Sequence, residues 1–313
     1  MVATSTRVET ELAAYVTGTF ESRAKTMRYP GLIAVLLAAM FCLQAVADEP
    51  EAVRITVSIL PQAWFAETIG AERVAVDVLV GPGHSPATYE PTPRQMAALE
   101  QADLFLSAGV PFEQGLVPRI QAMKPGPVMA GPEPGHYGHH HEIDPHTWLD
   151  PIQAVARADT ICRHLQQLAP DHAEEFGQRR DLLAEQMRRL DEQIRLNLDS
   201  YAGRSFLVFH PAFGHFAARY GLIQVPVEDG GHEPGPRHLA EVIDRAKADG
   251  SKSIVIQPQF SEKSAQTVAD AIGGEVVVLD PLAADYPENL MLITRTLAER
   301  FTAEDRARAE DGP

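Results

Sequence analysis

The sequence has little cysteine and no apolar run long enough to cross a membrane. Cys42 and Cys162 are the only cysteines among 313 residues, and Cys42 lies in the longest apolar run, Leu32 to Leu43. That run is about a dozen residues, whereas a membrane-spanning helix needs about 20. If the segment around Cys42 is removed, Cys162 is left without a partner, which excludes an internal disulfide.

Basic residues are also scarce. The chain has 27 Lys and Arg against 43 Asp and Glu, a net charge of -16. This charge argues against nucleic-acid binding and suits a soluble protein that meets cations, although solubility alone would also explain it.

Residues 27–47 have the form of a secretory signal. Arg28 precedes the apolar run, and Ala45-Val46-Ala47 forms the small-residue cleavage site, so we expect export to the periplasm and cleavage before Asp48. Met40 and Phe41 precede Cys42 where a lipoprotein signal has small residues, which disfavours a lipid anchor. The upstream residues 1–26 have no role in export, so Met27 is predicted to be the true start in place of Met1.

Short β-branched runs alternate with helical stretches along the rest of the chain. This alternation predicts an α/β fold whose parallel sheets are covered by helices on both faces, and the length allows two cores. We expect residues 1–47 to be an extension and signal, 48–170 an N-terminal lobe, 171–200 a linking helix and 201–313 a C-terminal lobe. The predicted strands are 54–60, 74–80, 104–109, 127–130, 206–210, 223–228, 253–257 and 275–280.

The linking helix is predicted from an unusually long pattern that runs from about Asp171 to Asn197. It has no Pro or Gly between Gln178 and Tyr201, and its apolar stripe consists of Leu183, Met187, Leu190 and Ile194. A helix of about 25 residues is about 37 Å long and stiff. The alternative is a local helical hairpin arm. A shorter amphipathic helix is predicted over 236–249.

Four side chains with metal-binding chemistry follow predicted strands or lie in the turns beyond them, where doubly wound sheets place their ligands. They are His84, His146, His210 and Asp280. Imidazoles and a carboxylate at tetrahedral positions match zinc, and nitrogen donors favour zinc over manganese. Each histidine also has a structural explanation, since His146 could cap a helix and His210 could be a core residue.

A Pro- and Gly-rich segment, 124–141, ends in His136, His139, His140 and His141. It is predicted to be a surface loop that either collects metal weakly or is simply solvated. We expect it to assist capture without forming the tight site.

The motifs together resemble the zinc- and manganese-binding receptors of ABC importers. The resemblance runs from about Arg54 to Phe301 through SPATYEPTP, ADLFLSAGVPFE, DPHTWLDP, FHPAFGHFAARYGL, GGHEPGPRHL, IQPQFSEKSA and LDPL. It implies two lobes joined by a rigid helix and a receptor that delivers metal to a permease in the cytoplasmic membrane. We expect a monomer that is not an enzyme and has no nucleic-acid partner.

Carried over by position, the ligands of the resembled family fall on His146, His210 and Asp280. Members tuned to manganese tend to have a carboxylate at the position of His210, so the resemblance favours Zn2+ over Mn2+ as the transported ligand. The usual Ser-Pro-His-x-Tyr appears here as Ser85 to Tyr89 with Ala87 in place of the histidine. His84 is the predicted fourth ligand, with a water molecule as the alternative.

Two other functions fit the same residues. Three ligands plus water is also the arrangement of catalytic zinc, although the chain lacks HExxH and its candidate bases are only Glu142 and Glu233. Glu233 lies in GGHEPGP, where a turn before a helix is the simpler role. A zinc buffer or chaperone without a permease is the third reading.

Overall fold

The computed structural model describes residues 52–123, 126–131, 144–228, 232 and 234–310. The predicted signal, the upstream residues 1–26, the four loop histidines, Glu142 and Glu233 therefore lie outside the described residues. Residues from Ala52 onward form one compact unit. None of the helices in the described ranges combines the length and apolar character that a membrane span requires.

The N-terminal half contains a parallel four-stranded sheet in the order β2-β1-β3-β4. Parallel strands need crossover connections, which helices provide here. Thr92 caps one of these helices, α4, by accepting a hydrogen bond from the Gln95 amide, and Pro93 occupies its first position. The elements are β1 (Val53–Ile59), α3 (Leu60–Gly70), η1 (Ala71–Arg73), β2 (Val74–Val80), α4 (Pro93–Glu100), β3 (Leu104–Leu106), α5 (Glu113–Ala122) and β4 (Val128–Ala130).

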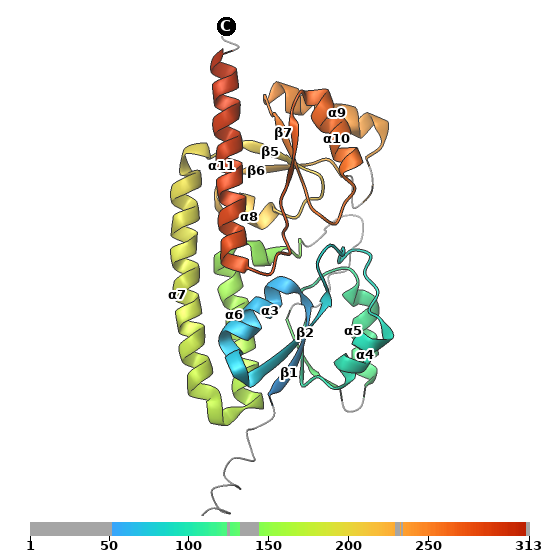
Figure 1. Ribbon diagram of the computed structural model, residues 1–313, viewed down its shortest axis with the longest axis vertical. Helices are drawn as coiled ribbons and strands as arrows, with labels where there is room; N and C mark the ends of the chain where they lie inside the picture. Colours follow the sequence, from blue (N-terminus) through green and yellow to red (C-terminus); the bar gives the residue numbers. More distant parts are fainter. Residues whose placement is uncertain (1–51, 124–125, 132–143, 229–231, 233, 311–313) are drawn as a thin grey trace, which may run out of the picture. The chain divides into compact units, whose positions relative to one another are not determined.

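The C-terminal half repeats the arrangement with the strand order β6-β5-β7-β8, again all parallel. The elements are β5 (Ser205–Val208), α8 (Gly214–Arg219), β6 (Ile223–Pro226), α9 (Pro236–Ala248), β7 (Ser253–Ile256), α10 (Glu262–Ile272) and β8 (Glu275–Val278). Two parallel sheets flanked by helices confirm the predicted fold class (Figure 1).

Long helices join the two halves. The connection consists of η2 (Thr147–Leu149), α6 (Pro151–Leu168), η3 (Pro170–His172), α7 (Ala173–Leu198) and η4 (Asp199–Tyr201), and the described chain ends in α11 (Tyr286–Glu310). The predicted apolar stripe of α7 is buried, with Met187 and Ile194 at 0 % exposure. Because α7 packs against α3 and α6 of the N-terminal half and against α11, it is not an isolated arm. The 25-residue helix α11 is not among the helices predicted from the sequence.

One hydrophobic core is shared by both halves. It includes Val57 of β1, Met187 of α7, Phe213 before α8 and Leu297 of α11. Two smaller cores lie between the sheets and their outer helices, one in each half. Cys162 of α6 is a free, buried thiol. The two sheets are therefore held by continuous packing as well as by the connecting chain.

Candidate metal centre

A cavity of about 590 Å³ is lined by residues that follow strands of both sheets. Ser85, Pro86 and Ala87 contribute from the turn after β2. His210, Glu228 and Gln257 contribute from the segments after β5, β6 and β7, and His146 and Trp148 from the region of η2. The cavity therefore lies where both parallel sheets present their carboxyl ends, as expected for ligand sites in this fold class.

His146 is held by Asp144. The Asp144 Oδ1 atom lies 2.7 Å from His146 Nδ1 and also accepts from the His146 backbone amide at 2.9 Å. Burial lowers the pKa of His146 below its ordinary value and outweighs the opposing effect of Asp144. A neutral imidazole that donates from Nδ1 keeps its lone pair on Nε2, which is the arrangement a metal ligand needs.

The carboxylate of Asp144 stays ionised in this setting. Burial raises its pKa, but the contacts with His146, led by the hydrogen bond to its ring, outweigh burial and lower it. Asp144 therefore fixes both the orientation and the tautomer of the ring beside it.

His210 is held in the same way from the other sheet. Its Nδ1 lies 2.5 Å from Oε2 of Glu228, a side chain that is 7 % exposed. Gln257 fixes the His210 backbone, donating to its carbonyl at 2.7 Å and accepting from its amide at 3.4 Å. Phe260 stacks on the His210 ring at 5.2 Å. Among the described residues, these contacts leave Nε2 of His210 as the nitrogen without a carboxylate partner.

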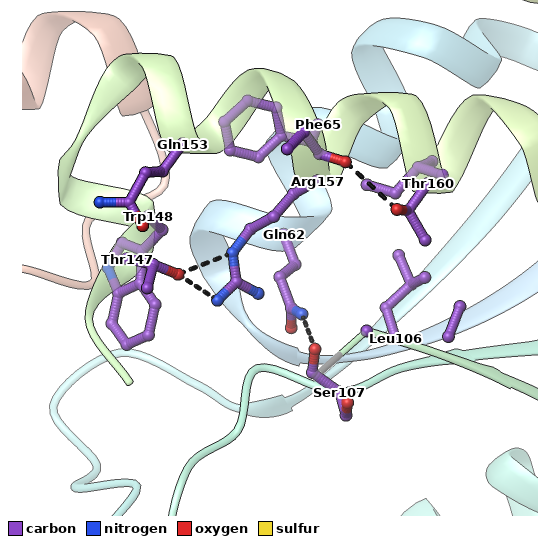
Figure 2. Close-up of a pocket in the computed structure, with 13 residues that line it drawn as sticks. Gln62, Phe65, Leu106, Ser107, Thr147, Trp148, Gln153, Arg157 and Thr160 are labelled. Atoms are coloured by element: carbon purple, nitrogen blue, oxygen red, sulfur yellow. Dashed lines mark hydrogen bonds between the residues drawn. The ribbon is translucent and has the colours of Figure 1, made fainter. Parts of the chain in front are cut away.

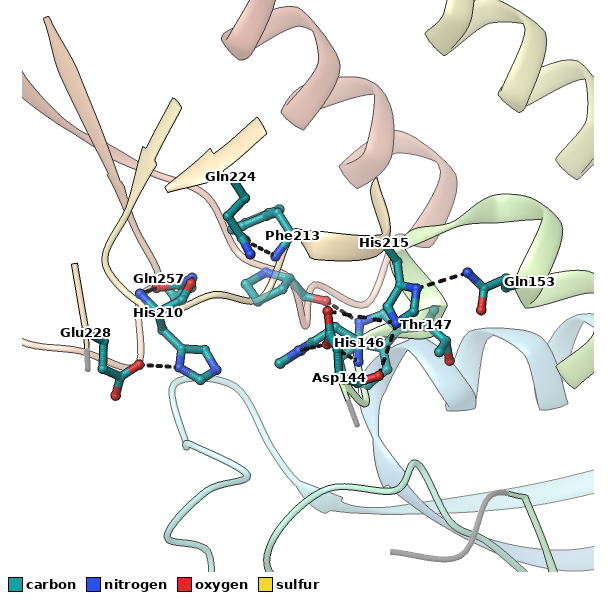
Figure 3. Close-up of polar contacts among 12 residues, drawn as sticks. Asp144, His146, Thr147, Gln153, His210, Phe213, His215, Gln224, Glu228 and Gln257 are labelled. Atoms are coloured by element: carbon teal, nitrogen blue, oxygen red, sulfur yellow. Dashed lines mark hydrogen bonds and ion pairs between the residues drawn. The ribbon is translucent and has the colours of Figure 1, made fainter. Parts of the chain in front are cut away.

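The two imidazoles face each other. Their ring centres are 5.4 Å apart with an interplanar angle of 73°, and Figure 3 shows each ring with its carboxylate behind it. Zn–N bonds of about 2.1 Å at tetrahedral angles put the centres of two bound imidazoles about 5 Å apart. The observed spacing suits two ligands of one ion.

The structure does not place Asp280 or His84 beside His146 and His210. Asp280 Oδ1 accepts from Gln259 Nε2 at 3.0 Å and from the Leu282 amide at 2.9 Å, and Gln259 and Leu282, not Asp280, line the cavity. His84 is exposed, with Nδ1 3.2 Å from the Pro82 carbonyl and its ring against Tyr89. Within the described ranges no three His, Cys, Asp or Glu side chains are close enough to hold a metal ion.

The residues that support the two histidines were not predicted from the sequence. His215 of α8 lies 3.1 Å from the Asp144 carbonyl through Nε2, and its Nδ1 lies 3.1 Å from Gln153 Nε2. Since the Gln153 amide group donates, His215 carries its proton on Nε2 and donates to Asp144. Asp144 lies two residues before His146 in DPH, and Glu228 ends the predicted strand 223–228, so Asp144 is visible as a carboxylate beside a candidate ligand and Glu228 as one at a strand end.

Comparison with known proteins identifies a family for this chain. A family profile described as "Zinc-uptake complex component A periplasmic" matches residues 55–300. The chain belongs to this family. The family description places such components outside the cytoplasm, in agreement with the export predicted from residues 27–47.

Relatives of this chain include the zinc-binding lipoprotein AdcA of Streptococcus pneumoniae, 28% identical over 279 residues. The match covers 82% of this chain and 56% of AdcA, so the chain spans about half the length of that relative. The high-affinity zinc uptake system protein ZnuA of Bacillus subtilis is 29% identical over 248 residues, covering 73% of this chain and 78% of ZnuA.

Two solved structures share the fold over most of this chain. A crystal structure of ZnuA has a TM-score of 0.74 and 35% identity, covering 80% of this chain and 99% of ZnuA. A zinc-bound deletion mutant of ZnuA has a TM-score of 0.73 and 34% identity, with 80% and 98% covered.

Proposed function

We propose that this chain captures zinc outside the cytoplasm and delivers it to the permease of an ABC importer. The observation that carries the proposal is the facing pair His146 and His210, each with Nδ1 held by a carboxylate, at a cavity between two sheets. Membership of a zinc-uptake family and relatives named for zinc support the same conclusion. We propose a periplasmic monomer, with the signal cleaved near Ala47.

The proposed ligands are Nε2 of His146, Nε2 of His210 and a carboxylate oxygen of Asp280. Asp280 Oδ1 already accepts two hydrogen bonds, so Oδ2 is the oxygen left for the metal. Two imidazoles and one carboxylate favour Zn2+ over Mn2+.

His84 is the proposed fourth ligand, with water as the alternative. Recruiting His84 requires its ring to leave Pro82 and Tyr89 and turn toward the cavity that Ser85 to Ala87 line. Gly83 makes such a change feasible, because it has a φ of +76 and no atom lies within 4 Å of the position of a Cβ. Glycine adopts this backbone region without the strain other residues have.

We propose binding without catalysis. Asp144 and Glu228, the carboxylates beside the two histidines, are each hydrogen-bonded to an imidazole Nδ1. A carboxylate so engaged is poorly placed to accept a proton from a metal-bound water, which a zinc hydrolase requires.

The test is zinc affinity in His210→Ala, measured by competition with a chromophoric chelator. Losing a ligand should weaken binding at least about a hundredfold, beyond the roughly 10–100-fold cost of losing a hydrogen-bond partner of a ligand. His164→Ala, on α6 and away from the cavity, is the matched control. Equal affinity in His210→Ala and the control would remove the main support for the site.

A further inference from the structure

A second cavity lies beside α6, apart from the two facing histidines (Figure 2). Its volume is about 370 Å³, within the range of small-molecule pockets. Apolar side chains dominate its wall, and the polar ones come from α3, from the residue after β3, from η2 and from α6. The lining residues include Gln62, Phe65, Trp148, Arg157, Thr160 and Ile161.

Arg157 is the cation of this cavity. Its Nε donates to Thr147 Oγ1 at 3.0 Å and its Nη2 donates to the same oxygen. Figure 2 shows the guanidinium between Thr147 and Gln62. Among the described residues no carboxylate lies within ion-pair distance of Arg157, whereas guanidinium groups in protein interiors are normally paired.

Glu113 is the acidic group whose charge acts on Arg157, and it does so from beyond ion-pair distance. Its own carboxylate accepts from the amides of Ala108 at 2.7 Å and Gly109 at 2.9 Å. Burial lowers the pKa of Arg157, with Glu113 opposing it. The positive charge of Arg157 is therefore only partly compensated.

The other polar groups of the wall are already engaged. Gln62 Oε1 accepts from the amides of Ser58 and Ile59, and its Nε2 donates to the Ser107 carbonyl at 2.8 Å. The hydroxyl of Thr160 donates to the Ala156 carbonyl at 3.2 Å. Recognition of a ligand in this cavity therefore depends on Arg157, while Phe65, Trp148 and Ile161 offer apolar contact.

We propose that this cavity binds a small monocarboxylate with an apolar tail, its carboxylate on the Arg157 guanidinium and its tail against Phe65 and Ile161. A planar guanidinium matches a carboxylate through parallel hydrogen bonds. At about 30 Å³ per water-sized group, the cavity holds roughly a dozen non-hydrogen atoms, enough for a short fatty acid or an aromatic acid. None of the proposed zinc ligands lines this cavity. The carboxylate proposal and the zinc proposal can therefore fail separately.

Calorimetric titration of the full chain with sodium butyrate, in low-chloride buffer, tests the proposal. Butyrate should bind the wild type and Arg188→Gln, an exposed control on α7. Arg157→Gln should weaken binding at least about tenfold, and the neutral isostere butyramide should bind the wild type at least about tenfold more weakly, since hydrogen bonds to charged groups contribute about 1.5–3 kcal/mol. If Arg157→Gln does not fold, Arg157→Lys is the second variant. It keeps the charge but loses the planar guanidinium that pairs with a carboxylate, so it should still weaken binding.

Equal binding of butyrate and butyramide, or undiminished binding in Arg157→Gln, overturns the proposal. Phosphate binding as tightly as butyrate would make the site a general anion site and also overturn it. If butyrate binds only after residues 132–143 are deleted, an acidic residue of this chain is the partner of Arg157. That result would also overturn the proposal.

Discussion

In each of the two facing histidines a carboxylate contacts Nδ1, which leaves Nε2 for a ligand. For His146 that carboxylate belongs to Asp144, whose backbone carbonyl accepts from His215, and Gln153 donates to the other nitrogen of His215. The orientation of the His146 ring therefore depends on residues that make no contact with the proposed metal, and the loss of such partners lowers the affinity of a metal-binding histidine.

Replacing Asp144 tests this dependence. Asp144→Ala should lower zinc affinity about 10–100-fold, the usual cost of losing the partner of a metal-binding histidine. Asp144→Asn should recover part of the loss, because its amide oxygen still accepts from Nδ1. Chelator competition measures both, with Asp159→Ala on α6 as the control. Equal affinities for Asp144→Ala and Asp144→Asn would point to general disruption instead of lost orientation.

The identity of the fourth ligand is decided by two substitutions near the turn after β2. If His84 binds zinc, His84→Ala should lower affinity considerably, and Ala87→His in that background should restore it because residue 87 lines the cavity. If water is the fourth ligand, His84→Ala should be nearly silent and Ala87→His alone should tighten binding. The chelator assay separates the two patterns, and a metal-bound structure with His84 in solvent would exclude the first.

His146 and His210 could be predicted from the sequence because each lies in a distinctive motif, DPHTWLDP or FHPAFGHF. The partner of His210 could not. Glu228 is 18 positions from His210, and the two meet only because β6 is the neighbour of β5 in the sheet. Strand order depends on packing of whole elements, which a local pattern does not contain.

At the scale of elements, all eight predicted runs overlap a strand, but the runs extend past several strand ends. The run 206–210 becomes β5, which ends at Val208, and the run 275–280 becomes β8, which ends at Val278. The apolar runs extend beyond the ends of the strands because the residues that follow still face the core. Phe209 after β5 and Leu279 after β8 are both buried. The metal-binding candidates therefore lie in the turns, where loops carry function.

The linking helix α7 is joined to α8 by a charged contact. Arg219 donates to Asp191 at 2.6 Å and 2.8 Å, and the Tyr220 hydroxyl donates to it at 3.0 Å. Burial raises the pKa of Asp191, but the hydrogen bonds from Arg219 and Tyr220 outweigh burial and lower it. The folded protein therefore prefers the ionised carboxylate more strongly than the unfolded chain does.

The lowered pKa of Asp191 predicts that the folded protein loses stability in acid. The contribution of Asp191 is fully present above its unfolded pKa of about 3.9 and is lost as the pH falls through its lower folded value. Asp191→Asn should cost about 1.5–3 kcal/mol at neutral pH and should lose less stability than the wild type on acidification. Denaturant unfolding from pH 7 to pH 3 measures the difference. The exposed Asp181→Asn should follow the wild type, and parallel curves for Asp191→Asn would contradict the assignment.

At the scale of the whole molecule, the shared core predicts that both halves unfold together. Melting should show one cooperative transition, and saturating zinc should shift it upward. At a thousandfold excess over the dissociation constant the gain is about 4 kcal/mol, on the order of 10 °C for a chain of this size. Calorimetry with zinc and with chelator tests both points. Two separate transitions would mean that the halves are independent, and coincident curves would mean that zinc is not a specific ligand.

The contact between α11 and the N-terminal half has a practical consequence. The chain has only two tryptophans, and both lie there: Trp64 stacks on Tyr286 at 5.4 Å, and Trp148 Nε1 donates to the Pro281 carbonyl at 2.8 Å. Ultraviolet emission excited at the indole band therefore originates entirely from this junction. The protein carries a built-in optical probe of whether its two sheets stay together, and no attached dye is needed to follow it in solution.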